Sequence, residues 1–380
     1  MLRPLLVGAL LVCSARAGAQ TEIDLPAAGD LGIFDAAPAS GPGRPRLWMS
    51  FSGVSDLQVG GAHISAVSTH LASSLDRGAV WDDTGLVINP ASVEPSPPAE
   101  LSGLPSVWQH EVSRIVYDRR AAADERWKLV WHRYLLADDG NAATHDGHFE
   151  YSWIGLKVAA SAPGLASAPE RKLFAGAAYS LRPEVTAYND AIGGPPEVRL
   201  DQLDPALGDC VVFTEPGLLA TSHALYVSLS CARPQPQEGR IVLVRWVQPA
   251  GPWEYVGTLL RSADAATFDP SFTSFSASEL AGGGRRLYLI VTPTVQPYDW
   301  YGGCLVFALE DLDRALLRDA DGDGKPDVLL RLAGSPGSFS GACGWDRAAR
   351  ASGIIYGQVF PAPQPVFHLF ASEMVPPRPR

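Results

Sequence analysis

The stretch Ser73–Asp83, SSLDRGAVWDD, places a hydroxyl, a carboxylate, a glycine and an indole at the spacing Ser74-x-Asp76-x-Gly78-x-x-Trp81. Serine and aspartate side chains can accept hydrogen bonds from the backbone N–H groups of a tight turn. Glycine permits the positive φ angle that such a turn needs, and tryptophan supplies a large apolar surface for packing beside it. The stretch therefore predicts a tight turn between packed strands. It bears on the fold of the protein and only indirectly on its function.

The chain around this turn is rich in strand-like segments and poor in helical ones. Its 37 glycines and 32 prolines are spread throughout, and only Leu309–Ala320 shows a short helical pattern. Apolar runs of strand length recur instead, rich in β-branched and aromatic residues and bounded by turn formers. Clear examples are RLWMSFSG (46–53), WKLVWHRYLL (127–136), GRIVLVRWV (239–247), RRLYLIVTP (285–293) and SGIIYGQVF (352–360). The sequence predicts an all-β protein.

Similar units follow one another along the chain. Five segments combine small residues, a turn and a strong apolar strand, and they begin near Phe34, Gln109, Phe213, Asp269 and Gly341. Roughly 70 residues per unit are enough for a four-stranded blade with loops. We therefore expect residues 20–374 to form one five-bladed β-propeller, followed by a disordered tail at 375–380. TEIDLP (21–26) would close the ring as the outer strand of the last blade; six blades or two β-sandwich domains are the alternatives.

The spacing from Ser74 to Trp81 resembles the Asp-box of sialidase-like β-propellers. In that family the box forms the turn between the third and fourth strands of a blade, on the face opposite the active site. The resemblance implies a propeller fold and assigns no catalytic residue. The Arg-Ile-Pro motif of true sialidases is missing, so sialidase activity is not expected.

A second turn, DADGDGKPD (319–327), has the pattern of a metal-binding loop. Carboxylates stand at its positions 1, 3, 5 and 9, and Gly324 at position 6 permits a sharp bend. The loop resembles the calcium loops of EF-hands and integrin-type repeats, although Leu330 at position 12 excludes an EF-hand proper. The resemblance implies a structural Ca²⁺ between a third and a fourth strand; a solvated acidic turn is the alternative. The implied ligands are Asp319, Asp321, Asp323, the Lys325 carbonyl and Asp327.

Three acidic residues stand near the start of the first strand in three of the five units. They are Asp35, Glu111 and Glu215, and the first strands of propeller blades face a central funnel. This arrangement resembles the five-bladed glycosidases that act on arabinan and xylan chains. The resemblance implies that Asp35 activates water as the base, Glu215 protonates the leaving oxygen, and Glu111 tunes and orients them. The alternative is that these acids bind backbone between blades or stay solvated at the rim.

Neighbouring residues are candidates for contacting a substrate. Trp108 and Arg114 flank Glu111, and an arginine there could hold a hydroxyl or a carboxylate. Tyr298, Trp300 and Tyr301 stand in the loop VQPYDWYGG (295–303), where aromatic faces could stack on sugar rings. Packing within the protein is the alternative for all five.

A histidine-rich loop is expected on the same face as the three acids. His145, Asp146, His148 and Glu150 lie in ADDGNAATHDGHFE (137–150) and could bind a transition metal or supply a base. Solvation is the more common fate of such a polar loop.

The N-terminus has the features of a secretory signal. MLRPLLVGALLVCSARAGAQ carries an early arginine, a short apolar run and a small-x-small site that ends at Ala19. We expect residues 1–19 to be removed and the protein to be secreted or periplasmic. No later apolar run is long enough to span a membrane. Without Arg3 and Arg16, 28 basic residues face 41 acidic ones, a formal charge of −13, which disfavours nucleic acid as a partner.

The mature chain keeps four cysteines, Cys210, Cys231, Cys304 and Cys343. An even number in an exported protein indicates two disulfides, although spacing alone leaves three connectivities open. We favour Cys210–Cys231, which a hairpin could bring together, and hence Cys304–Cys343.

The sequence therefore favours a secreted, carbohydrate-active β-propeller, expected to be a monomer that binds a carbohydrate or a small polar ligand. Two functions remain open: a glycoside hydrolase that uses the funnel carboxylates, and a non-catalytic propeller that binds glycans or proteins. Motifs of serine hydrolases, nucleotide-binding proteins and zinc peptidases are missing from the sequence.

Overall fold

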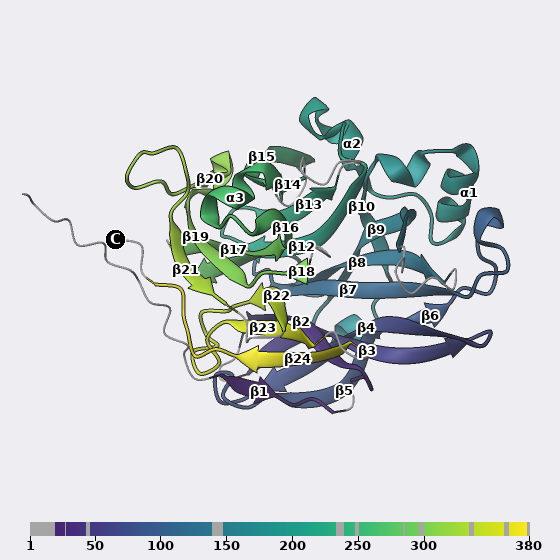
Figure 1. The fold of residues 1–380 in the computed structure, drawn as a ribbon, viewed down its shortest axis with the longest axis horizontal. Coiled ribbons are helices and arrows are strands. Elements are labelled where there is room, and N and C mark those ends of the chain that lie inside the picture. Colours follow the sequence, from purple (N-terminus) through teal and green to yellow (C-terminus); the bar gives the residue numbers. More distant parts are fainter. Residues whose placement is uncertain are drawn as a thin grey trace, which may run out of the picture.

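The computed structural model describes residues 20–26, 28–42, 46–138, 147–232, 239–247, 251–283, 286–295, 300–333, 338–360 and 365–377. Strands dominate these residues, and their helices are short: α1 (Pro183–Ala191), α2 (Leu200–Leu203) and α3 (Ala265–Phe268) (Figure 1). This confirms the all-β prediction. None of the helices in the described ranges has the length and apolarity needed to cross a membrane.

The first and last parts of the chain meet in one sheet. The first part consists of β2 (Gly32–Ser40), β3 (Leu47–Val59), β4 (Ala62–Ser74) and β5 (Asp82–Asn89). The last part consists of β22 (Phe339–Gly344), β23 (Ile355–Phe360) and β24 (Val366–Ala371), and β1 (Thr21–Ile23) pairs with β24. Between β2–β5 and β22–β24, strand pairing is limited to one described residue pair, Gly32 with Phe367, so these are two antiparallel meanders that pack side by side. The outer strand therefore comes from the N-terminus, as predicted.

Three further sheets lie between these ends in sequence. The second contains β6 (Ser92–Val93), β7 (Ser106–Tyr117), β8 (Trp127–Ala137), β9 (Gly147–Ala159), β10 (Arg171–Ala175) and β11 (Val198–Arg199). The third contains β12 (Val212–Ala220), β13 (Leu225–Ala232), β14 (Arg240–Trp246) and β15 (Trp253–Arg261). The fourth contains β16 (Phe272–Gly283), β17 (Arg286–Val295), β18 (Trp300–Tyr301), β19 (Cys304–Asp311), β20 (Leu316–Leu317) and β21 (Val328–Leu332).

The first long strands of the five groups form a closed ring. β2 contacts β7, β7 contacts β12, β12 contacts β16, β16 contacts β22, and β22 contacts β2 again. Each of the five carries an irregularity at the same level of its pairing with the next strand: between residues 34 and 37, 111 and 114, 214 and 217, 275 and 278, and 341 and 344. Such bulges bend a strand and redirect its side chains. The repeated bulge therefore marks one common level around the ring.

The apolar core is divided among the contacts between neighbouring groups. Separate clusters lie between the first and second groups, the second and third, the third and fourth, the fourth and last, and the last and first. Large members include Trp131, Phe174, Phe307, Tyr356 and Phe51, all fully buried. Because apolar burial is the main favourable contribution to folding, each group depends on both of its neighbours for stability.

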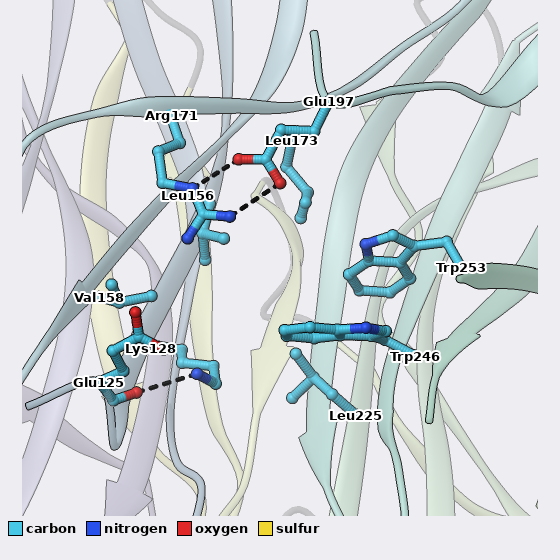
Figure 2. A pocket seen from close by; sticks show the side chains of 10 residues that line it. All are labelled: Glu125, Lys128, Leu156, Val158, Arg171, Leu173, Glu197, Leu225, Trp246 and Trp253. Carbon is cyan, nitrogen blue, oxygen red and sulfur yellow. Dashed lines mark hydrogen bonds and ion pairs between the residues drawn. The ribbon is translucent and has the colours of Figure 1, made fainter. Parts of the chain in front are cut away.

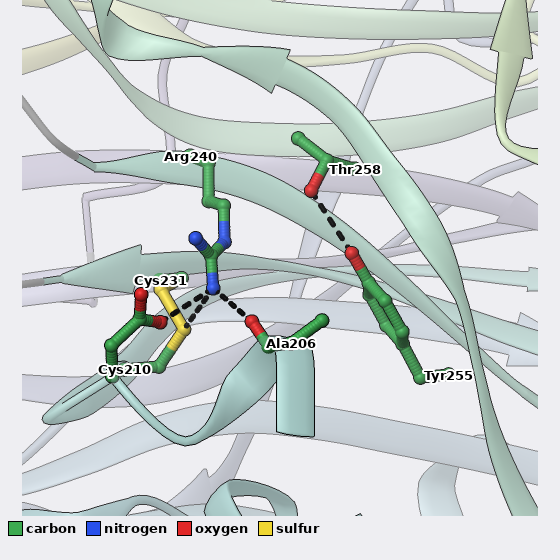
Figure 3. The surroundings of a disulfide bond; sticks show 7 residues. Ala206, Cys210, Cys231, Arg240, Tyr255 and Thr258 are labelled. Atoms are coloured by element: carbon green, nitrogen blue, oxygen red, sulfur yellow. Dashed lines mark hydrogen bonds and ion pairs between the residues drawn. A yellow bond between two sulfur atoms is a disulfide. The ribbon is translucent and has the colours of Figure 1, made fainter. Parts of the chain in front are cut away.

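Both expected disulfides are present. Cys210–Cys231 links the segment before β12 to β13. Beside this disulfide, Arg240 donates hydrogen bonds to the Asp209 carboxylate at 2.6 Å and to the Ala206 carbonyl (Figure 3). Cys304–Cys343 joins β19 to β22 and so connects two different groups.

The Ser74–Trp81 stretch forms the turn between β4 and β5, the third and fourth strands of the first group. The Ser74 hydroxyl accepts a hydrogen bond from the Gly78 N–H at 2.9 Å, and the Asp76 carboxylate accepts one from the Val80 N–H at 3.0 Å. Gly78 has a φ angle of +88°, and Trp81 is buried. Each residue has the local role that its chemistry predicts; its identification as an Asp-box stays a prediction.

Candidate active site

The three predicted acids come from three neighbouring strands of the ring and lie at its bulges. Asp35 on β2 and Glu215 on β12 both have a φ angle of +55°, a conformation that is uncommon for residues other than glycine. In β7 the equivalent residue is Val112, with a φ angle of +49°, so Glu111 stands one position before the residue that matches Asp35 and Glu215. We call Asp35, Glu111 and Glu215 the acid cluster.

A cavity of about 360 Å³ opens beside the acid cluster. Asp35 and Glu111 line it, whereas Glu215 is buried and is not among the described lining residues. The remaining lining residues come from the first, fourth and last groups: Phe34, Ser52, Val54, Ser65, Val67, Ser276, Tyr301, Val359 and Phe367. The Tyr301 ring is stacked on Phe34 with 5.5 Å between centroids, and Phe367 meets Phe34 edge-on at 5.7 Å. The cavity therefore has an acidic side and an aromatic side.

Asp35 receives more hydrogen bonds in the cluster than the other two acids. The Ser52 hydroxyl donates to its Oδ2 at 3.0 Å, and the Val112 N–H donates to the same oxygen at 3.4 Å. Burial raises the pKa of Asp35, while the Arg114 charge and these two donors oppose the rise. Hydrogen bonds to a carboxylate favour its ionised form.

Glu111 and Glu215 experience mainly forces that favour the neutral acid. Burial and then the charge of Asp35 raise the pKa of Glu111 to about 8, although a hydrogen bond from Tyr134 opposes this. Burial, followed by the charges of Glu111 and Asp35, raises the pKa of Glu215 well above its usual value. Since carboxylates that share a site cannot all ionise together, the acid cluster retains at least one proton at neutral pH.

Two buried oxygens of the cluster have no hydrogen-bond partner among the described residues. They are Asp35 Oδ1 and Glu215 Oε2. Buried polar atoms are almost always hydrogen-bonded in native proteins, to protein groups or to water. These two oxygens are therefore available to a water molecule or to a hydroxyl of a ligand.

Arg114 is fully buried and lies behind the acids instead of in the cavity wall. Its Nε is 2.6 Å from the Glu279 carboxylate on β16, and its Nη1 donates to the Ser113 carbonyl at 3.0 Å. Sequence reasoning missed Glu279, Ser52 and Tyr134. A signal for Glu279 existed, since it is an acid in the first strand of the fourth repeat, at FTSFSASELAGG (272–283).

The structure places Trp108 in the core. Its indole N–H donates to Glu94 at 2.8 Å, its ring lies 5.2 Å from that of Trp153, and the guanidinium of Arg133 lies 4.5 Å from its ring centroid. In a regular strand, residues three apart face opposite sides, so Trp108 points away from the side of β7 that presents Glu111. Trp108 therefore packs inside the protein and does not contact the cavity.

Other predicted contacts fall partly outside the described residues. Tyr298, His145 and Asp146 lie outside them, and only the backbone of Trp300 is described, as part of β18. His148 Nδ1 lies 3.6 Å from the Glu150 carboxylate.

The predicted calcium loop lies between β20 and β21, which both pair with β19. It is therefore an excursion within the outer strand and does not separate a third from a fourth strand. Oxygens of Asp319, Asp321 and Asp323 lie within 4.8 Å of one another. Their carboxylates accept backbone hydrogen bonds from inside the loop, as from Gly324 to Asp319 at 2.8 Å and from the Lys325 N–H to Asp323 at 2.8 Å. Asp327 lies outside this cluster and accepts a bond from the Ala320 N–H at 2.9 Å.

A second hollow lies between the second and third groups (Figure 2). It is bounded by the stacked rings of Trp246 and Trp253, 5.8 Å apart, and by the ion pair of Arg171 with Glu197. Its volume is about 50 Å³, room for one or two water molecules. The hollow is too small for a sugar unit, so the cavity beside the acid cluster is the candidate site.

No family model matches the sequence, and no curated protein matches it. Several solved structures are similar to it. A family 117 glycoside hydrolase from the marine bacterium Zobellia galactanivorans has a TM-score of 0.50 and 11% identity, over 93% of this chain and 89% of that one. A Bacillus subtilis arabinanase has a TM-score of 0.42 and 11% identity, over 89% and 95%. A GH32 β-fructofuranosidase from Bombyx mori has a TM-score of 0.46 and 12% identity, and the match covers 90% of this chain but 58% of the silkworm enzyme.

These similar structures are glycoside hydrolases of β-propeller type. Similarity at such low identity shows the fold alone, since one fold supports many functions. The protein is thus a nearly all-β chain with a propeller-type fold, and its activity has to be argued from the cavity.

Proposed function

We propose that this protein is an exported glycoside hydrolase on a five-bladed β-propeller, with the acid cluster as its catalytic centre. The observation that carries the proposal is the cluster of three acids from three neighbouring strands, two of which line one cavity that also has aromatic lining residues while the third is buried beside them. The closed ring of first strands and the five separate core clusters support five blades. The disulfides suit an oxidising compartment, which supports export.

Cleavage of a glycosidic bond needs one ionised and one protonated carboxyl group. Asp35 is suited to be the base, because Ser52, the Val112 N–H and Arg114 all favour its ionised form. Asp35 would take a proton from a water molecule as the water oxygen bonds to the anomeric carbon. A protonated acid would give its proton to the leaving oxygen as the old bond breaks.

Glu215 is suited to be that acid, because burial and two neighbouring carboxyl groups favour its neutral form. Glu111 would raise the pKa of Glu215 and hold the sugar from the cavity wall, in keeping with its place beside Asp35. The aromatic wall of Phe34, Tyr301 and Phe367 offers apolar faces to the C–H groups of a sugar ring.

The cavity suits a neutral sugar. Two acids line it, a third lies close by, and the described lining residues include no lysine, arginine or histidine. A uronate or a sulfated sugar would place a further negative charge against these carboxylates. We therefore expect hydrolysis of neutral glycosides and rejection of anionic ones.

The test is a screen of the purified protein on chromogenic glycosides and neutral polysaccharides. Wild type should release product, and Glu215→Gln should lose that activity while it keeps its thermal stability. Glu170→Gln, which alters a half-buried acid that pairs with Arg133 and does not line the cavity, is the matched control and should retain activity. If wild type and Glu215→Gln behave alike on every substrate, the catalytic proposal fails.

Arg114 favours a second candidate, glycan binding without turnover. A guanidinium behind the acids offsets part of their charge and could keep them as simple hydrogen-bond partners. A glycan array separates the two functions. Binding by wild type and by Glu215→Gln, with no product from either, would identify a binding protein.

We also propose that the loop at residues 319–327 holds a structural Ca²⁺. Three carboxylates converge there, and oxygen donors suit this hard cation. The loop belongs to the outer edge of the fourth group, whereas the acid cluster belongs to the first strands, so the ion would have no part in the reaction.

A further inference from the structure

We infer that the hairpin formed by β3 and β4 is a fixed wall of the cavity, that Gln109 fastens it to β7, and that this wall admits the end of a neutral sugar chain but not its interior. Only the identity of the ligand as a glycan rests on the proposed function. We call residues 54–67, which form the distal half of this hairpin, the upper hairpin.

The upper hairpin rises well beyond the level of the acid cluster. β3 and β4 are each 13 residues long and pair with each other along their whole length (Figure 1). The Ser52 hydroxyl, which donates to Asp35, marks the level of the acids. Residues 53–59 extend β3 beyond that level by about 23 Å, at roughly 3.3 Å per residue. The upper hairpin is therefore tall enough to border a bound sugar chain.

One face of the upper hairpin lines the cavity. Val54, Ser65 and Val67 are lining residues, together with Ser52 lower on β3. Val54 stands directly opposite Val67 across the two strands, so both side chains lie on the same face of the sheet. The hairpin itself therefore bounds the cavity on this side.

The other side of the upper hairpin packs against the second group. Ile64 and Ala66 belong to a buried apolar cluster with Val107 of β7 and Leu136 of β8. Movement of the upper hairpin away from the second group would expose these side chains to water, which is unfavourable. The packing therefore opposes an outward swing of the wall.

Gln109 of β7 fastens the outer edge of the upper hairpin. Among the described residues, β5 pairs with β4 no further than Thr69, so beyond that point β4 has no neighbouring strand on this edge. The fully buried Gln109 side chain takes the place of that strand. Its Oε1 accepts a hydrogen bond from the Val67 N–H at 2.7 Å, and its Nε2 donates to the Ser65 carbonyl at 3.1 Å. Since residues two apart in a strand share a face, Gln109 makes these bonds beside Glu111.

A fixed wall beside the acids restricts the form of the substrate. An enzyme that cleaves the interior of a chain has to accommodate several sugars on both sides of the bond that breaks. Here the upper hairpin blocks one direction, and the cavity of about 360 Å³ is near the lower end of the range for ligand sites. The protein is therefore expected to act on the terminal sugars of a neutral chain.

The fastening is tested by hydrogen exchange at the Val67 amide. Gln109→Met keeps most of the side-chain volume but removes both hydrogen bonds, so this amide should exchange at least about tenfold faster. Gln58→Met, which alters an exposed glutamine near the tip of the same hairpin, is the matched control and should leave the exchange unchanged. Equal exchange in wild type and Gln109→Met would overturn the fixed wall.

The consequence for the substrate is tested on a neutral polysaccharide that wild type hydrolyses in the screen. Terminal cleavage releases small sugars from the start while the viscosity of the solution falls late, and interior cleavage reverses this order. Wild type should show the terminal pattern, and Gln109→Met should shift toward interior cleavage. If Gln109→Met slows both kinds of cleavage alike, Gln109 is only structural and the inference fails. Early loss of viscosity with wild type would overturn the wall and leave the hydrolase standing.

A glycan array distinguishes failure of the wall from failure of the proposed function. If nothing is hydrolysed, binding that depends on the terminal sugar and not on chain length supports the wall, although the hydrolase proposal fails. Binding that strengthens with each internal sugar overturns the wall. If the protein neither hydrolyses nor binds any glycan, the inference about chain ends fails together with the proposed function.

Discussion

The two groups of acidic residues in this protein have the same chemistry and opposite surroundings. Those of the acid cluster are largely buried, and the guanidinium of Arg114 is itself paired with Glu279. Asp319, Asp321 and Asp323 lie close together on the outside of the molecule and accept hydrogen bonds from their own loop. Burial raises the pKa of Glu111 to about 8, whereas backbone donors such as the Gly324 N–H lower the pKa of Asp319.

The comparison teaches that carboxylates in close proximity do not define a function. Where water is excluded, burial and neighbouring carboxylates raise the pKa values of the acids. Some of them then stay protonated beside ionised ones, which suits acid–base chemistry. Where backbone N–H groups and water reach them, the acids remain charged and become suited to a cation. Three predictions test this contrast.

The largest expected effect is on turnover. Asp35→Asn should lower kcat on a hydrolysed glycoside by about a thousandfold or more, because the base that activates water is lost. Asp321→Asn in the outer loop should leave kcat within about twofold of wild type. Steady-state kinetics on matched preparations measures both; a similar loss in the two variants would remove the functional distinction between the regions.

A smaller effect is expected on the pH dependence of stability. The pKa of Glu111 is raised in the folded protein, so the folded state binds more protons than the unfolded state between about pH 4.5 and 8. The free energy of unfolding should then fall as the pH rises through this window, by on the order of 2 kcal/mol. Urea unfolding of wild type should show this slope, and Glu111→Gln should flatten it. A slope that is the same in wild type and in Glu111→Gln would mean that Glu111 is ionised throughout this window.

The smallest effect is expected from removing calcium. Chelation should lower the melting temperature by a few degrees, because one ion stabilises the loop only in proportion to its occupancy. Returning Ca²⁺ should restore it, and Asp321→Asn should abolish the response. If titration calorimetry shows no heat on adding Ca²⁺ and the melting temperature does not change, the loop binds no calcium and is a turn stabilised by its own hydrogen bonds.

Much of the architecture could be predicted from local pattern. Alternating apolar runs and turn formers predicted the strands, and the Ser74–Trp81 spacing predicted the contacts of one turn. The acid cluster was found because its members share a place in repeated units. Glu111 stands one residue before the position that Asp35 and Glu215 occupy in their strands, and this offset could not be predicted because a bulge has no clear signal in the sequence.

The rest depends on contacts between distant segments. Nothing near Arg114 in the sequence indicates that its partner is Glu279, because the pairing arises only when β7 and β16 meet around β12. Trp108 was proposed as a substrate contact from its nearness to Glu111, although strand alternation favours opposite faces. Tyr134 belongs to the second strand of its group and reaches Glu111 only through the sheet.

The pairing of β1 with β24 has a consequence for how the protein is made. The side chains of Glu22 and His368 meet at 2.6 Å and are separated by 346 positions. The pairing of β1 with β24 therefore cannot form until almost the whole polypeptide has been synthesised. Contacts between such remote segments form slowly. In a newly made chain, β24 should therefore stay unpaired with β1 for some time. A reagent that binds the unpaired edge of β24 would measure how long this lasts.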